Sequence, residues 1–434
     1  MLISENYLKF LFISILLIYS AHVFSINKDE LEYKDRVYSE NIKSMRMHLD
    51  GWEVSYPILD MHGDNSLLFS FDYLESVSEA FYYTIIHCNA DWKPSNLMFF
   101  EYADGFEENQ IRDYESSYNT HVHYTHYNIL FPNNDIRFTK SGNYLLVVYS
   151  YESNKKIIAC TKRFMIVEQI LEIEGRVNPS ADNLHRRTSH KLDFKIFRNN
   201  LYIDDPFREI KIVIMQNFQW HNKIEGLQPS FINHYELVYE FEERNLFRAS
   251  NEYRYFTFHD TERLSERVEH IDFRHPYYYI RLYADESNLF RRYSSYEDIN
   301  GSYVIRTQKF GTQDYSEIEA DYAIVHFKLN YDVPVDNAEV YIFGELSNRE
   351  ISDEYKMEYN LETRAYEKIL LLKQGYYNYR YLLVDNDKNK PPDHAFFEGS
   401  HFETENDYLL FIYHREPGRT YDKLVAYRKF NSRD

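Results

Sequence analysis

The run Ser141-Gly142-Asn143-Tyr144-Leu145-Leu146-Val147-Val148-Tyr149 is the stretch that decides the fold class of this chain. A Ser-Gly-Asn turn signal leads into continuous β-branched, aromatic and aliphatic residues, which is the pattern of a buried β-strand. Similar runs occur at 66–74, 81–88 and 164–167. Strands spaced by roughly 8 to 12 residues are typical of β-sandwiches. The sequence therefore predicts an all-β protein.

Strand-like runs continue along the whole chain and divide it into three blocks. We expect a first domain at 34–169, a middle domain at 170–312 and a C-terminal domain at 317–434, each an immunoglobulin-like β-sandwich in tandem. The polar stretch 311–320 marks the last boundary. The C-terminal block, with the runs 340–346 and 375–385, resembles the early-set immunoglobulin-like domains that include glycogen-binding modules.

The composition favours sheet and argues against a nucleic-acid partner. The 434 residues include 43 Tyr and 31 Phe, and tyrosine suits half-buried strand surfaces because its ring packs while its hydroxyl reaches water. AT-rich coding is an alternative source of the same excess. The formal net charge is −20, with no compensating Lys/Arg cluster, so phosphate backbones would repel the protein. The plain interpretation of the charge is solubility.

Residues 1–25 have the pattern of an export signal. Lys9 precedes the apolar stretch 10–18, which is too short to span a bilayer comfortably. Small residues follow at Ala21 and Ser25, and we expect cleavage near Ser25. No cysteine follows the apolar stretch, which argues against a lipid anchor on the cleaved terminus. An uncleaved membrane anchor is the alternative.

The sequence offers few candidates for chemistry. Its two cysteines, Cys88 and Cys160, lie in strand-like segments, and an exported context permits a disulfide between them. His121 and His123 would share one face of a strand and could place two metal nitrogens, whereas His126 would point the other way. The alternative is histidines packed among neighbouring tyrosines.

Sequence motifs for nucleotide binding, serine hydrolases and zinc proteases do not occur. We therefore predict no catalytic residues, no cofactor and no metal. Two other functions stay open from the residues alone. A glycan-binding module would need sugar-stacking rings, and because no tryptophan follows Trp220, Tyr376 and Tyr377 would have to serve. A hydrolase would need two of the 69 carboxylates to meet.

An ordered set of motifs resembles the type IX secretion system plug protein family of Bacteroidota. The set runs over nearly the whole expected mature chain and consists of 87–95, 102–106, 113–120, 124–133, 141–144, 216–220, 246–247, 251–256, 300–303, 374–379 and 421–430. Ala249-Ser250 departs from the pattern, because a glycine is expected there, and Tyr253 stands where Phe is usual. Both departures put only local backbone geometry in doubt.

The resemblance implies a periplasmic protein that is peripheral to the outer membrane. It would dock on the periplasmic mouth of a large outer-membrane translocon barrel and seal the pore when no substrate occupies it. We place the contact on three motif-rich loops, whose candidate partner-binding residues are Asp91, Trp92, Ser95, Tyr102, Gly105, Phe106, Asp113, Ser116, Asn119 and Thr120. The alternative for each residue is internal scaffolding, with polar side chains capping turns and Trp92 packed inside.

Overall fold

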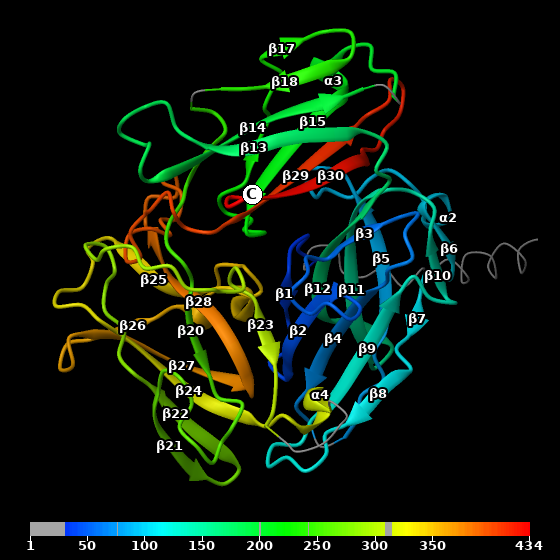
Figure 1. Cartoon of the computed structure of the whole chain (residues 1–434). Coiled ribbons are helices and arrows are strands. Elements are labelled where there is room, and N and C mark those ends of the chain that lie inside the picture. Colours follow the sequence, from blue (N-terminus) through cyan, green and yellow to red (C-terminus); the bar gives the residue numbers. More distant parts are fainter. Residues whose placement is uncertain (1–30, 76, 199–200, 242, 309–314) are drawn as a thin grey trace, which may run out of the picture.

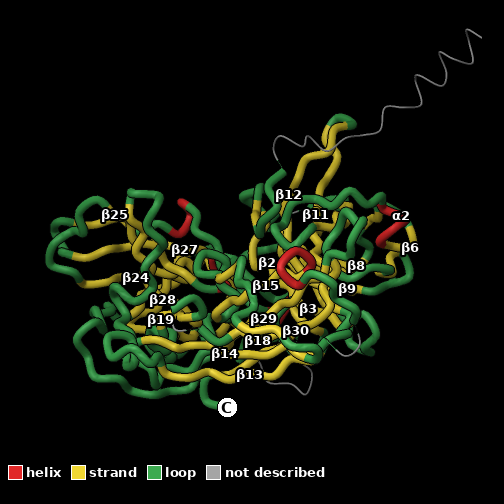
Figure 2. Tube along the Cα trace, turned by 90° about the horizontal axis from the view of Figure 1, so that it is seen from above, coloured by secondary structure: helices red, strands yellow, loops and turns green. Residues whose placement is uncertain are grey.

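The computed structural model describes residues 31–75, 77–198, 201–241, 243–308 and 315–434, and strands dominate it (Figures 1 and 2). The all-β prediction is confirmed. Its immunoglobulin-like detail stays a prediction, and the expected export signal at 1–25 lies outside the described residues. The helices described are each one turn long: α2 (Phe99–Tyr102), α3 (Pro206–Glu209), α4 (Ser316–Glu319), η1 (Glu345–Ser347) and η2 (Asp353–Tyr355). Within the described ranges, no helix is long and apolar enough to cross a membrane.

The first body is a sandwich of two sheets at the right of Figure 1. One sheet has the order β1-β12-β11-β5-β7 with β3 beside β12, and the other has the order β2-β4-β9-β8. Their strands, with the small β6–β10 ribbon, are β1 (Arg36–Val37), β2 (Ile42–Leu49), β3 (Ile58–Asp60), β4 (Leu67–Tyr73), β5 (Tyr82–Cys88), β6 (Ala103–Gly105), β7 (Asn109–Gln110), β8 (Asp113–Ser116), β9 (Thr125–Phe131), β10 (Ile136–Phe138), β11 (Gly142–Glu152) and β12 (Lys155–Val167).

The middle body is a second sandwich, and it is completed by the C-terminal strands, drawn in red in Figure 1. One sheet has the order β13-β14-β18-β17 with β19 beside β14, and the other has the order β16-β15-β29-β30. The strands are β13 (Glu172–Pro179), β14 (Ser189–Phe197), β15 (Ile210–Gln216), β16 (Ile224–Glu225), β17 (Phe231–Ile232), β18 (Glu236–Tyr239), β19 (Leu246–Arg248), β29 (Asp407–His414) and β30 (Lys423–Asn431).

The third body lies at the lower left of Figure 1 and again pairs two sheets around one core. The order β21-β22-β24-β27-β26 forms one sheet, and β28 holds β20, β23 and β25 in the other. The strands are β20 (Arg254–Thr257), β21 (Val268–Arg274), β22 (Tyr277–Leu282), β23 (Tyr303–Ile305), β24 (Tyr322–Asn330), β25 (Ala338–Phe343), β26 (Glu358–Asn360), β27 (Ala365–Lys373) and β28 (Gly375–Asp385).

The strand pairing moves the expected domain boundaries. β29 and β30 were expected in the domain 317–434, but β29 pairs with β15 along its whole length and so belongs to the middle body. In the other direction, β20 and β23 were expected in the domain 170–312 but pair with β28 of the third body. The division at 312–317 is corrected, because one hydrophobic core spans it.

The first and middle bodies share a fourth core, which we call the junction core. Along β11, Tyr144 and Leu146 point into the first body's own core, whereas Leu145 and Val147 point into the junction core. Phe411 of β29 enters the same junction core from the middle body. Because adjacent strand residues face opposite sides, a strand buried on both faces has a continuous apolar run. Four sheets therefore form one continuous stack through the two bodies.

Cys88 and Cys160 do not form the disulfide that the sequence permitted. Both thiols are free and buried, and they lie in different cores on opposite faces of the same sheet. Cys88 is opposite Asn143 on β11, whereas Cys160 is opposite Val148 on the same strand. Five positions along a strand separate them by about 17 Å, far more than a disulfide spans.

Candidate partner-binding surface

The loop 91–95 after β5 turns its tryptophan inward. Trp92 has a φ of 61° and is only 7% exposed. Its ring packs edge-on against Trp220 of the middle body, with 5.3 Å between ring centroids. Asp91 is exposed, and the hydroxyl of Ser95 lies 2.9 Å from Nδ1 of His87. Trp92 is therefore part of the contact between the first and middle bodies.

Arg163 on β12 joins all three bodies at this contact. Its guanidinium carbon lies 3.5 Å from the centre of the Trp220 ring and 5.4 Å from that of Trp92. It also pairs with Asp35 at 3.4 Å and with Glu350 of the third body. Burial raises the pKa of Glu350 to about 7, although the charge of Arg163 opposes the rise. Two indole rings (Trp92 and Trp220) and three charged side chains (Arg163, Asp35 and Glu350) therefore hold the three bodies together at this buried contact.

The segment 102–106 is buried at its start and exposed at its end. Tyr102 is 6% exposed, and its hydroxyl donates to the carbonyl of Ile85 at 3.0 Å. Gly105 has a φ of 123°, and a Cβ there would lie 1.8 Å from the carbonyl oxygen of Asp135, so glycine is required. Phe106, immediately after it, is 70% exposed.

The segment 113–120 forms a sheet edge and then a loop. β8 is exposed along its whole length at the edge of its sheet, so Asp113 and Ser116 are accessible. Asn119 is also exposed, with a φ of 58° that asparagine tolerates better than most residues. The hydroxyl of Thr120 donates to the carbonyl of Val122 at 2.9 Å. Thr120 therefore stabilises the loop.

The end of this loop attaches to the third body. The amide of Tyr118 donates to the carbonyl of Ile318 at 2.9 Å. The Asp321 carboxylate accepts the backbone N–H of His121 at 2.9 Å and that of Val122 at 3.0 Å. These bonds bind residues 118–122 to the chain around α4.

The three histidines do not converge. The ring of His121 packs against Phe273, with 4.5 Å between centroids, and His123 is exposed. His126 is buried, and its Nδ1 lies 2.6 Å from a carboxylate oxygen of Asp72. Throughout the described part of the chain, no three potential ligands gather as a metal site would need.

A buried charge cluster joins the first and third bodies. The ammonium of Lys373 on β27 lies 2.6 Å from Asp72 on β4, and both side chains are fully buried. The hydroxyl of Tyr322 donates to the same carboxylate at 2.6 Å. Burial would raise the pKa of Asp72, but Lys373 and His126 together hold it below its usual value. Asp72 therefore stays ionised in the interior, where both partners stabilise it.

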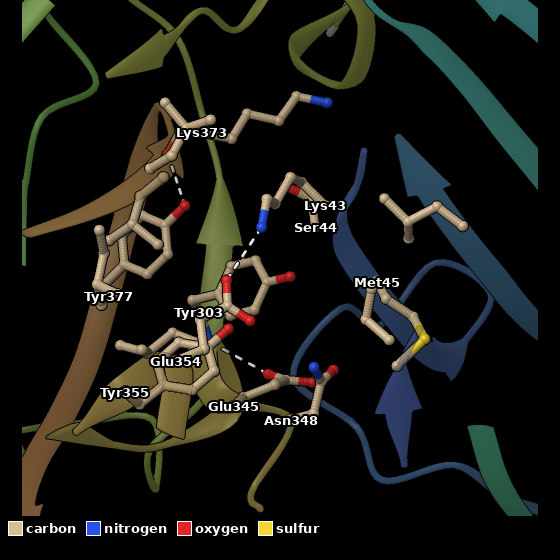
Figure 3. Close-up of a pocket in the computed structure, with 16 residues that line it drawn as sticks. Lys43, Ser44, Met45, Tyr303, Glu345, Asn348, Glu354, Tyr355, Lys373 and Tyr377 are labelled. Carbon is tan, nitrogen blue, oxygen red and sulfur yellow. Dashed lines mark hydrogen bonds and ion pairs between the residues drawn. The ribbon is translucent and has the colours of Figure 1, made fainter. Parts of the chain in front are cut away.

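A small cavity lies beside this cluster, between β2 of the first body and the third body (Figure 3). Its volume is about 50 Å³, which is enough for a few water molecules and too little for a cofactor. Lys43 reaches across it to Glu354 at 3.0 Å. The cavity is part of the contact between the bodies. Tyr377, which also lines it, is 2% exposed, so this ring is not available to stack on a sugar.

Two exposed apolar side chains near the predicted loops were missed by the sequence analysis. In the run 97–100, Leu97 and Phe99 pack against the first core, whereas Met98 is 65% exposed and Phe100 is 74% exposed. An unbroken apolar run in a segment without a strand pattern was the available signal. With Phe106, these side chains form what we call the apolar segment of the first body.

Comparison with known proteins gives a family and a close structural relative. The model of the type 9 secretion system plug protein first domain matches residues 42–168. A crystal structure of a hypothetical protein from Parabacteroides merdae ATCC 43184 is 33% identical, with a TM-score of 0.88, and the match covers 93% of this chain and 100% of that chain.

Other solved structures that match are too dissimilar to support a conclusion about this protein. The C-terminal domain of the Streptococcus pyogenes antigen I/II-family protein AspA matches at 7% identity over 89% of this chain and 99% of that chain, but its TM-score is 0.16. No curated protein matches. The family match covers the first body with all three motif-rich loops, and the 33% identical relative extends the similarity to the other two bodies. The chain belongs to the family of type 9 secretion system plug proteins.

Proposed function

We propose that this protein binds the periplasmic mouth of the outer-membrane translocon barrel of the type IX secretion system and seals its pore while no substrate occupies it. In this proposal residues 1–25 direct export and are cleaved near Ser25, and the protein is peripheral to the outer membrane. The role needs no catalysis and no cofactor. The family match over residues 42–168 is the observation that carries the proposal.

The architecture supports a role as a rigid stopper. Occluding a pore requires a body that keeps its shape under contact, because a flexible one would lose ordering entropy on docking. The four-sheet stack is continuous through the junction core, and the third body is held to it by Arg163–Glu350 and Asp72–Lys373. The protein is therefore preorganised as one unit.

We place the partner contact on the apolar segment of the first body. Met98, Phe100 and Phe106 are each at least 65% exposed and lie within the family-matched region. Exposed aromatic side chains are preferred anchors of protein interfaces. Of the other candidate residues, Asp91, Gly105, Asp113, Ser116 and Asn119 are exposed and complete the proposed surface. Trp92 and Tyr102 are buried, so we do not place them on the contact surface itself.

Affinity purification from detergent-solubilised outer membrane tests the proposal. We expect the tagged protein to recover a barrel protein of far greater mass. The double variant F100S/F106S should recover it at least about tenfold less well, because interface aromatics are typical hot spots. Phe290, which is 95% exposed on the third body, supplies the matched control F290S, and this variant should recover the barrel normally.

Two results would overturn the proposal. The first is a protein that elutes from native membranes as a monomer without any barrel. The second is a barrel that the F100S/F106S variant recovers normally and the F290S variant fails to recover. That result would place the contact on the third body.

A further inference from the structure

A cleft opens where the three bodies meet, away from the apolar segment. Its volume is about 280 Å³, and each body contributes to its lining. Trp52 comes from the β2–β3 connection of the first body, and Asp298 and Asn300 come from the chain before β23. Glu405, Asp407 and Lys429 come from the β29–β30 hairpin of the middle body and its approach.

The cleft combines an accessible indole with an excess of negative charge. Trp52 is 54% exposed, whereas the other two tryptophans of the chain, Trp92 and Trp220, are buried at the junction. Three carboxylates line the cleft against one lysine. Lys429 lies 3.4 Å from Asp407, which also accepts the hydroxyl of Tyr56 at 3.0 Å.

The remaining two carboxylates differ in their partners. Arg433, outside the lining, pairs with Glu405 at 2.8 Å. Asp298 accepts the backbone N–H of Asn300 at 2.7 Å and that of Tyr253, and none of the described cations forms an ion pair with it. Burial raises the pKa of Asp298 to about 6; its two backbone hydrogen bonds and the charge of Arg380 oppose this rise, and Glu405 adds to it. A cation placed in the cleft would stabilise this carboxylate.

Asn300 lies in the same wall of the cleft. Its Oδ1 is buried and has no hydrogen-bond partner in the part of the chain that the structure describes. The cleft thus presents carboxylates in excess beside one aromatic side chain.

We propose that this cleft binds an arginine side chain from an extended segment of a protein partner. A guanidinium supplies five N–H donors, stacks on an indole and matches the excess of carboxylates. The cleft is slightly smaller than the roughly 300 Å³ at which small-molecule sites begin, so it fits one long side chain better than a cofactor. This site is separate from the apolar segment and does not depend on the proposed pore-sealing role.

A neutral glycan is the competing ligand, because sugars also stack on tryptophan. The charge argues for arginine: Glu405 and Asp407 already have cations, but a sugar would leave Asp298 without one, whereas a guanidinium would supply it. The two ligands therefore differ in how they respond to the charge of Lys429.

Surface plasmon resonance over the immobilised protein tests the site with two blocked tripeptides, Ser-Arg-Ser and Ser-citrulline-Ser. Citrulline keeps the shape of arginine and removes its charge. We expect saturable binding of the arginine peptide and about tenfold weaker binding of the citrulline peptide, since charge-assisted hydrogen bonds are lost. Maltoheptaose serves as the neutral glycan probe.

Two variants with opposite expected effects make the test independent of folding defects. W52A should weaken arginine-peptide binding about fivefold, as the loss of a cation–π contact predicts. K429Q removes the one lining cation and should strengthen it about threefold. The control F290A removes another exposed aromatic side chain and should leave the binding of both peptides unchanged. Thermal unfolding confirms that each variant is folded.

Equal binding of both peptides, or absence of arginine-peptide binding to the folded protein, would overturn the inference. Binding of maltoheptaose that W52A abolishes and K429Q leaves unchanged would assign the cleft to a glycan instead. None of these results bears on recovery of the translocon barrel, so failure of this inference is distinguishable from failure of the proposed function.

Discussion

The guanidinium carbon of Arg163 lies 3.5 Å from the centre of the Trp220 ring, and this contact connects the first and middle bodies. Arg163 belongs to β12 of the first body, and Trp220 follows β15 of the middle body. Because Glu350 of the third body pairs with the same guanidinium, one side chain couples all three. The stability of the whole protein should therefore depend strongly on it.

Replacing Arg163 by methionine should destabilise the protein by about 3–5 kcal/mol, because the buried Glu350 would lose its cation and the contact with the Trp220 ring would be lost. Asp35 keeps Lys162 as a partner at 3.0 Å. We expect differential scanning calorimetry to show a lower and broader transition, as the bodies lose their coupling. The control R137M alters an exposed arginine and should change stability by no more than about 0.5 kcal/mol. An unaltered calorimetric transition in R163M would show that the junction does not couple the bodies.

The Asp72–Lys373 pair should give a large coupling energy in a double-mutant cycle. K373M alone should cost about 3–5 kcal/mol, since it leaves a fully buried carboxylate without its cation. D72N alone should cost a similar amount, and the double variant should cost much less than the sum of the two. Urea unfolding measures all four states. Additive costs would mean that the two charges do not stabilise each other.

The pH dependence of unfolding should change in opposite directions at two buried groups. Burial lowers the pKa of His87 to about 4. The contribution of the neutral His87 to the free energy of unfolding is therefore fully present above pH 6.5 and is lost as the pH falls. H87Q should remove about 2 kcal/mol of acid sensitivity between pH 7 and pH 5. The raised pKa of Glu350 has the opposite effect on stability. The contribution of Glu350 to the free energy of unfolding is present below about pH 4.5 and is lost as the pH rises through about 7.

E350Q should therefore increase acid sensitivity over the same interval by about 2 kcal/mol. Urea unfolding at pH 5 and pH 7 measures both variants against the parent protein, with the exposed His123 supplying the control H123Q. Shifts of equal sign in H87Q and E350Q would contradict the assignment of these two environments.

Cys88 and Cys160 should remain thiols even after export. Burial raises the pKa of both thiols well above its usual value, so the native protein should not react with a thiol reagent at neutral pH. In urea without reductant, two thiols should titrate. Failure of either thiol to titrate in urea would show that the cysteines pair, against the register along β11.

Local patterns predicted individual strands well. The run 144–149 lies within β11, and the alternating run 191–197 lies within β14. Each pattern reports which faces of a strand are buried, and that is decided by adjacent residues alone. The continuous apolar run of β11 follows from burial in two cores, one on each face.

Long-range pairing could not be predicted in the same way. Nothing near β29 in the sequence indicates that it returns to pair with β15, about two hundred positions earlier, because any apolar strand edge accepts another. For the same reason Trp92 was a candidate for partner contact. An indole after a turn has the same local pattern whether it packs on Trp220 or on another protein. The exposure of Met98 and Phe100 could not be predicted either, because it depends on how their neighbours Leu97 and Phe99 pack against the first core.

Photo-crosslinking in intact cells tests the central claim most directly. A photoreactive amino acid placed at Phe106 should yield an adduct with an outer-membrane barrel of far greater mass. The same residue placed at Phe290, which is more exposed than Phe106 and lies on the third body, should not. An adduct from position 290 alone, or no adduct from either position with the protein at native abundance, would contradict the account.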